Sequence, residues 1–168
     1  MTDPKIAAFL HSPAGQHRLQ SIVTTALAVG HAAQANPGVC SVTVAGKTDD
    51  TQPGGMCCKQ ARQIHEIAFG LHDHSWQFAA ATAHDTEQAL IAAGRQLSGI
   101  VAGCVLCFND GSVGHIVTYA GNNECVENTS DGSRGVPQRP GTKITPLSEI
   151  AAAHGGNTGR PYYAGLLV

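Results

Sequence analysis

The chain has 168 residues, of which 42% are hydrophobic and 13% are charged, and its formal net charge at pH 7 is −2. This length suffices for one domain with its own hydrophobic core, and we expect a single domain over residues 1–168, with a helical part (1–50) and a core part (51–168). The slightly negative charge and an aromatic content of 5% give no basis for binding nucleic acid or an anionic membrane.

The N-terminal part is predicted to be mainly helical. Residues 6–10 form a short helical turn, and a longer helix over residues 14–34 carries an apolar stripe. The segment Asn36-Pro37-Gly38 ends this helix. Residues 39–45 alternate enough for a short strand or an extended arm, and residues 46–55 are predicted to be a loop because of their aspartates, glycines and proline.

A cysteine marks the start of the next predicted helix, which runs from Met56 to a stop at Gly70. Cys57 lies on the apolar stripe expected to face inward, whereas Cys58 is rotated from it by about 100°. The thiolate is the nucleophilic form of cysteine, and the positive end of a helix dipole lowers the pKa of a thiol. Cys57 is therefore our candidate nucleophile, with Cys58 as the alternative.

Beyond a polar, histidine-rich loop the chain adds one helix and then changes to strands. Residues 86–97 are predicted to be helical. Three segments, at 101–108, 114–120 and 124–129, are expected to form an antiparallel meander joined by short turns.

The C-terminal part is predicted to contain less regular structure. Residues 130–142 form a loop rich in glycine, proline and arginine, residues 145–149 start a helix, and residues 162–168 form a terminal strand. A chain with its helices first and its sheet afterwards belongs to the α+β class.

The meander carries a histidine and two polar residues that complete a candidate site. His115 opens the second strand, and Glu127 follows it by twelve residues, a separation that a short hairpin brings together. Asn128 points to the opposite face of its strand unless that strand bulges. We therefore prefer Glu127 as the group that orients His115, and Asn128 remains the alternative.

Each of these residues has a common structural explanation when taken alone. A buried helical cysteine usually serves packing, and a strand histidine is more often a core or edge residue. A cysteine at a helix start, followed by a histidine and a carboxylate on neighbouring strands, is much less expected by chance. Together they are the nucleophile, base and orienting group of a thiol hydrolase.

The arrangement resembles the NlpC-type and CHAP-type cell-wall hydrolases, papain-like cysteine peptidases that cut amide bonds in peptidoglycan. The resemblance covers residues 54–130. It rests on the segments 56–64, similar to the nucleophile helix of the family, 103–108, similar to a core strand, and 114–130, similar to its Gly-His-apolar hairpin. It implies a papain-like α+β fold in which the N-terminal helices and the nucleophile helix pack on an antiparallel sheet, and it makes residues 51–168 the catalytic core.

The resemblance assigns Cys57 as nucleophile, His115 as base and Glu127 as third member. The chain departs from the family pattern at three places. It has Met-Cys-Cys-Lys where members have Asp-Cys-Ser-Gly or a Cys-Thr-aromatic run, which leaves the choice between Cys57 and Cys58 open. It has Cys104 where the family usually has Asp, and Glu127 where the family has His, Asn or Gln.

The resemblance implies a cysteine amidase or endopeptidase that cleaves the stem peptide or cross-link of peptidoglycan without a metal or other cofactor. The N-terminus lacks a basic region followed by an apolar run, so we expect no ordinary secretory signal. We expect synthesis in the cytoplasm and delivery to the periplasm or cell wall by a non-Sec route, as an antibacterial toxin acting on a rival cell. The expected partners are a peptidoglycan peptide and a cognate immunity protein, and no nucleic acid or membrane.

Other functions compete with this one. A phage-type lysin would use the same chemistry, and a thiol acyltransferase or deamidase would share Cys57 and His115 but ignore peptidoglycan. A metal or redox module would be built on Cys57, Cys58, Cys104, Cys107 and histidines such as His72 and His74. Against it, Cys104 and Cys107 lie in an apolar run where residues three apart face opposite sides of a strand. A non-catalytic binding domain with a degenerate site is the fourth alternative.

Overall fold

The computed structural model describes residues 2–36, 42–44, 46–49, 56–70, 82–109 and 114–165, and in these ranges the chain is an α+β protein with five helices and a five-stranded antiparallel sheet. The helices are α1 (Pro4–His11), α2 (Pro13–Ala35), α3 (Cys57–Phe69), α4 (Ala83–Ala92) and α5 (Leu147–Ala153). The strands are β1 (Val42–Val44), β2 (Lys47–Asp49), β3 (Val105–Phe108), β4 (His115–Gly121), β5 (Glu124–Thr129), β6 (Gly141–Pro146) and β7 (Arg160–Tyr162).

The large sheet has the strand order β6-β5-β4-β3-β7, and β1 and β2 form a separate hairpin. The predicted meander is confirmed, because β3 pairs with β4 and β4 with β5, all antiparallel. In this register Phe108 lies opposite His115, and Thr118 lies opposite Val126. The hairpin between β4 and β5 thus brings the start of β4 beside the end of β5.

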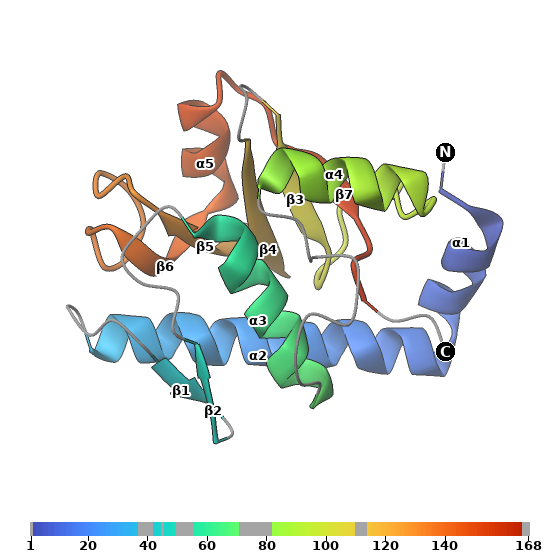
Figure 1. The fold of residues 1–168 in the computed structure, drawn as a ribbon, viewed down its shortest axis with the longest axis horizontal. Coiled ribbons are helices and arrows are strands. Elements are labelled where there is room, and N and C mark those ends of the chain that lie inside the picture. The colour runs from blue at the N-terminus through green and yellow to red at the C-terminus, as the bar shows by residue number, and fades with distance from the viewer. Residues whose placement is uncertain are drawn as a thin grey trace.

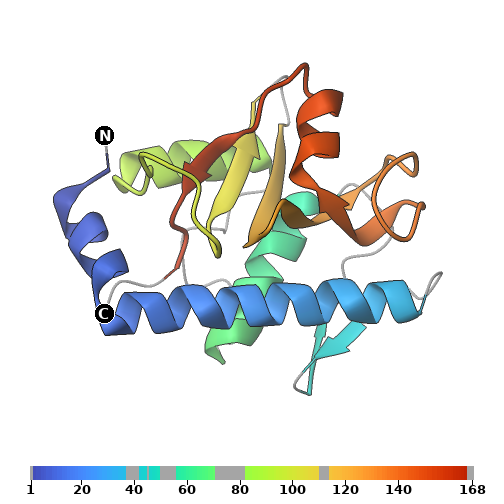
Figure 2. The same ribbon diagram turned by 180° about the vertical axis from the view of Figure 1, so that it is seen from behind.

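Helices cover the sheet from different sides. In Figure 1, α3 and α4 lie in front of the strands, and the long helix α2 passes along the lower end of the sheet behind α3. Seen from behind in Figure 2, α2 is nearest the viewer, and β3, β4 and β7 stand in front of α4. None of the helices in the described ranges has the length and apolarity needed to cross a membrane.

Alternation along β3 divides the buried side chains into two clusters. Leu106 and Phe108 pack with residues of α1, α2 and α5, whereas Val105 and Cys107 pack with residues of α3 and α4. Cys104 belongs to the first cluster, so Cys104 and Cys107 face opposite sides of the sheet, as the sequence predicts.

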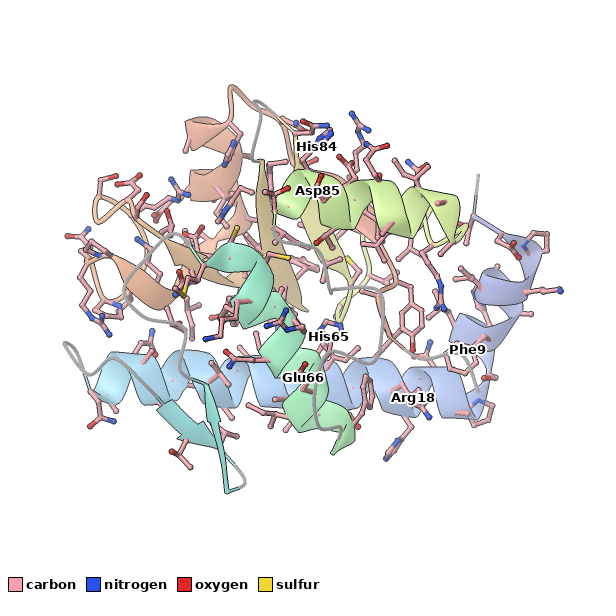
Figure 3. All side chains as sticks on the ribbon, viewed as in Figure 1. Phe9, Arg18, His65, Glu66, His84 and Asp85 are labelled. Atoms are coloured by element: carbon pink, nitrogen blue, oxygen red, sulfur yellow. The ribbon has the colours of Figure 1, made fainter. Side chains whose placement is uncertain are left out.

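The N-terminal helices are fixed to the rest of the chain by close contacts. The Arg18 guanidinium of α2 lies 5.0 Å from the centre of the Phe69 ring at the end of α3, and the Phe9 ring of α1 lies 5.7 Å from that of Tyr163 (Figure 3). Gly30 leaves room for β6, because a Cβ at this position would lie 2.5 Å from the Ile144 side chain. These contacts hold α2 against both α3 and the sheet.

Several predicted boundaries are wrong. Residues 47–49 pair with β1 instead of forming a loop, and residues 141–146 form the edge strand β6 instead of a loop and a helix start. The fourth helix begins at Ala83, three residues before its predicted start, because Thr82 accepts a hydrogen bond from the backbone of Asp85. It ends at Ala92 and not at residue 97.

The structure also differs from the prediction at the start of the first meander strand and in the extent of the last strand. Residues 101–104 are not part of β3, since Gly103 turns the chain with a φ of 89°. The last strand covers only residues 160–162. Some predictions concern residues outside the described ranges. These are the histidine-rich loop at 71–81, most of the turn after residue 109, and residues 166–168.

Candidate active site

Cys57 is the first residue of α3, as predicted. Met56 is the N-cap, and Gly70 ends the helix in the left-handed conformation with a φ of 66°. In the described part of the chain no side chain caps the first turn of α3, in contrast to the capped helices α1, α2 and α4. The backbone N–H groups of an uncapped first turn give the Cys57 thiol a positive electrostatic environment.

The Cys57 thiol is partly exposed and forms a hydrogen bond with His115. Burial raises the pKa of the thiol, and the hydrogen bond and charge of His115 lower it. The backbone N–H groups of Ile116 and Cys58 act in the same direction, so the pKa of Cys57 is lowered from its usual range. The site therefore favours the thiolate, the reactive form.

His115 connects the thiol to a buried carboxylate. Its Nε2 donates a hydrogen bond to Glu127 Oε2 at 2.7 Å. Since Glu127 occupies Nε2, the nitrogen that remains for Cys57 is Nδ1. Burial lowers the pKa of His115, but the hydrogen bonds with Cys57 and Glu127 raise it to about 9. The imidazolium is thus stabilised between two groups of opposite charge.

Glu127 is fully buried on β5 and accepts hydrogen bonds from three side chains. Besides His115, Thr145 donates to Oε1 at 2.6 Å, and Arg134 donates to Oε1 at 3.1 Å and to Oε2 at 3.2 Å. Burial raises the pKa of the carboxyl, but the hydrogen bonds from His115 and Arg134 lower it to about 2. Glu127 is an anion throughout the neutral range.

The alternative Cys58 lies on a different side of α3. It is 5% exposed, packs with Ala61 and Ala83, and its Sγ is 2.9 Å from Thr86 Oγ1. Burial raises the pKa of this thiol. The sequence predicted that only the face of α3 carrying Cys57 points inward, and this is wrong. Helix α4 covers the face that carries Cys58, so Cys58 is more buried than Cys57.

The alternative Asn128 forms hydrogen bonds with Met56 and Thr142. Its Oδ1 accepts a hydrogen bond from the backbone N–H of Met56 at 2.9 Å, and its Nδ2 donates to Thr142 Oγ1 at 3.4 Å. Asn128 therefore ties the start of α3 to β5 and β6. This contact sets the distance between the strand that carries Glu127 and the helix that carries Cys57.

A cleft of about 570 Å³ opens above Cys57 and His115. Its walls come from the start of α3, the start of α4, the beginning of β4, the loop after β5 and the end of α5. No residue of α1 or α2 lines this cleft among the described residues. The N-terminal helices thus pack behind α3 and do not cover the candidate site.

His154 was missed by the sequence analysis. Its ring lies parallel to that of His115, with 5.8 Å between centres and 11° between planes, and it stacks on Phe108 at 4.6 Å. His154 follows α5, far from His115 in sequence, and no local pattern connects the two. We expect this stack to restrict the movement of the His115 ring.

We expect His154→Ala to slow alkylation of Cys57 by iodoacetamide at pH 7 about five-fold, the equivalent of about 1 kcal/mol for the lost ring contact. His154→Phe keeps a flat ring at this position and is expected to stay within about two-fold of the unchanged protein. Mass spectrometry of the Cys57 peptide measures the rate. Equal rates for both variants would show that the stack has no influence on His115.

A third histidine, His65, lies on α3. His65, labelled in Figure 3, is fully buried, and its Nδ1 donates to Ala61 O at 2.8 Å. Burial lowers its pKa to about 4, which keeps the ring neutral. His65 therefore contributes to packing between α3 and its surroundings.

The cysteines predicted as alternatives for metal binding lie in two clusters, with Cys104 on one side of the sheet and Cys58 and Cys107 on the other. Cys57, Cys58, Cys104, Cys107 and Cys125 are free thiols, and burial raises the pKa of Cys104 to about 12 and that of Cys107 well above its usual range. Within the described ranges no three His, Cys, Asp or Glu side chains are placed to share a metal ion. His72 and His74 lie outside these ranges.

The structure thus brings Cys57, His115 and Glu127 into one hydrogen-bonded series at the floor of a cleft, and it places Cys58 and Asn128 beside that series. Comparison of the chain with protein-family models, with curated proteins and with solved structures finds no match.

Proposed function

We propose that this chain is a papain-like cysteine hydrolase that cleaves an amide bond in the stem peptide or cross-link of peptidoglycan. The observation that supports the chemistry is the series Cys57–His115–Glu127, in which each group stabilises the charged form of the next. The peptidoglycan substrate is supported by the resemblance of residues 54–130 to cell-wall hydrolases. The open cleft of about 570 Å³ has room for a short peptide.

In the first half of the reaction the Cys57 thiolate attacks the carbonyl carbon of the amide. A C–S bond forms, and the carbonyl π electrons move to the oxygen. Backbone N–H groups of the first turn of α3 stabilise this oxyanion. When the intermediate collapses, the C–N bond breaks, and His115 gives its Nδ1 proton to the departing amine.

In the second half His115, now neutral, takes a proton from water while the oxygen of that water attacks the thioester carbon. The C–S bond then breaks, the carboxylic acid leaves, and the thiolate and imidazolium are restored. Glu127 stays ionised throughout and keeps Nε2–H of His115 in its hydrogen bond, so that Nδ1 remains directed at Cys57.

Digestion of purified peptidoglycan tests the proposal. The unchanged protein in reducing buffer is expected to release muropeptide fragments whose masses identify the broken bond. His115→Ala, which lacks the base but leaves Cys57 in place, is expected to lower the rate at least about 100-fold. Folded protein that alkylates normally at Cys57 yet releases no fragment would refute the peptidoglycan substrate and favour an acyltransferase or deamidase.

We further propose that the enzyme acts as an antibacterial toxin in the periplasm of a rival cell. Peptidoglycan is present only outside the cytoplasmic membrane. Expression with an added secretory signal is therefore expected to lyse a Gram-negative host, whereas cytoplasmic expression at the same level is expected to be tolerated. His115→Ala with the same signal is the control. Equal toxicity in both compartments would contradict the proposed target.

A further inference from the structure

A loop between β5 and β6 supplies a cation to the candidate site. Arg134 is 12% exposed in its side chain, borders the cleft and forms two hydrogen bonds with Glu127, through Nε and Nη2. Its Nη1 donates to Asp131 Oδ2 at 2.9 Å. The guanidinium thus binds both oxygens of the carboxylate that holds His115.

Buried contacts fix the backbone of this loop. Lys143 of β6 is fully buried, and its Nζ donates to the carbonyl oxygen of Arg134 at 2.7 Å and to that of Asp131. The backbone N–H of Gly135 donates to Glu149 at 3.3 Å. A side chain at Gly135 would collide with Thr145, because its Cβ would lie 2.2 Å from Oγ1. The loop can therefore approach β6 closely only with glycine at this position.

The same loop is paired to β6 through its backbone. Val136 N–H donates to Ile144 O at 2.7 Å, and Ile144 N–H donates to Val136 O at 3.0 Å. Burying cations such as Lys143 is costly unless their hydrogen bonds are satisfied, and such pairs contribute little net stability. Here the buried contacts place the Arg134 guanidinium against the Glu127 carboxylate with bidentate geometry. Such a pair fixes the orientation of the carboxylate in addition to stabilising its charge.

We infer that Arg134 is a positioning residue, which keeps Glu127 charged and turned toward His115 so that the Cys57–His115 pair can form. The inference rests on the proposed function for its effect on hydrolysis, but its effect on Cys57 is independent of any substrate. The hydrogen bonds described for Arg134 go to Glu127 and Asp131, so we expect it to act on Cys57 through Glu127.

The test compares Arg134→Gln and Arg134→Lys with Arg139→Gln, a matched change in the same loop, where the Arg139 guanidinium donates a hydrogen bond to Pro140 O. Iodoacetamide alkylation of Cys57 is followed from pH 4 to 10 by mass spectrometry, and circular dichroism checks folding. In the unchanged protein alkylation rises at low pH because the thiolate is stabilised.

Arg134→Gln removes a positive charge and two hydrogen-bond donors from Glu127. We expect the acidic limb of the alkylation profile to move to higher pH by about one unit and fragment release to fall at least about ten-fold. Arg134→Lys keeps the positive charge but cannot form two parallel hydrogen bonds with the carboxylate. We therefore expect the acidic limb of the alkylation profile to move by less than about half a pH unit and fragment release to fall about three-fold. Arg139→Gln is expected to match the unchanged protein.

The inference is overturned if folded Arg134→Gln has the same alkylation profile as Arg139→Gln. If Arg134→Gln does not fold, Arg134→Lys decides: a profile and a release rate equal to those of Arg139→Gln also overturn it. Failure of the proposed function gives a different pattern, in which no variant digests peptidoglycan while the Arg134 variants still shift the alkylation profile.

Discussion

Cys57→Ala is expected to lower the release of peptidoglycan fragments by at least about 10³-fold, as loss of the nucleophile does in other hydrolases that form an acyl-enzyme. Cys58→Ala is expected to stay within about three-fold of the unchanged rate. The difference follows from the surroundings of the two thiols. His115 lowers the pKa of Cys57, whereas burial raises the pKa of Cys58 and its sulfur lies beside Thr86.

For stability we expect the reverse order, with Cys58→Ala more destabilising than Cys57→Ala. Cys58→Ala removes a buried sulfur and its contact with Thr86, and we expect a loss of about 1 kcal/mol in the free energy of unfolding. Cys57 is only partly buried, and its replacement is expected to change stability less. Urea denaturation of both variants measures this. Loss of fragment release in Cys58→Ala with full release in Cys57→Ala would show that Cys58 is the nucleophile.

Local patterns were sufficient to locate the elements that carry the candidate triad. The periodicity of residues 57–69 and the glycine at position 70 define α3, and the short turn at 122–123 defines the hairpin that brings His115 to Glu127. Strand alternation also predicted that Glu127 and not Asn128 faces His115. These features depend on neighbours close in sequence, which is why they can be read without a structure.

The groups that fix Glu127 could not be found in this way. Thr145 and Lys143 lie on β6, an edge strand with a composition like that of a loop, and their roles arise only when β6 pairs with β5. Arg134 lies in an irregular segment where no period assigns a direction to its side chain. A run of arginine, glycine and proline indicates a loop but not which carboxylate an arginine will bind.

Glu127→Gln is expected to lower fragment release about 10³-fold, because a neutral amide no longer stabilises the imidazolium and can favour the wrong ring tautomer of His115. It also leaves Arg134 without its buried carboxylate partner, and we expect a loss of about 3 kcal/mol in the free energy of unfolding near neutral pH. The matched control is Glu124→Gln, a change on the same strand at its far end, where Glu124 pairs with Pro146.

The pKa shifts of Glu127 and His115 determine the pH range in which their ion pair stabilises the fold. The pKa of Glu127 is lowered to about 2, so its contribution is present above about pH 4.5 and is lost as the pH falls through about 2. The pKa of His115 is raised to about 9, so its contribution is present below about pH 6.5 and is lost as the pH rises through about 9. Both contributions are complete only between about pH 4.5 and 6.5.

Urea denaturation at several pH values from 3 to 10 should therefore show that Glu127→Gln loses most stability, relative to the unchanged protein, within that window. The difference should shrink at alkaline pH, where His115 is neutral and the ion pair with His115 is absent in both proteins. It should stay above zero, because Arg134 has lost its buried carboxylate partner and keeps only the exposed carboxylate of Asp131. Glu124→Gln is expected to follow the unchanged protein throughout. A stability difference that stays constant from pH 5 to 10 would mean that Glu127 supports the fold through packing and hydrogen bonds alone and does not hold His115 as a cation.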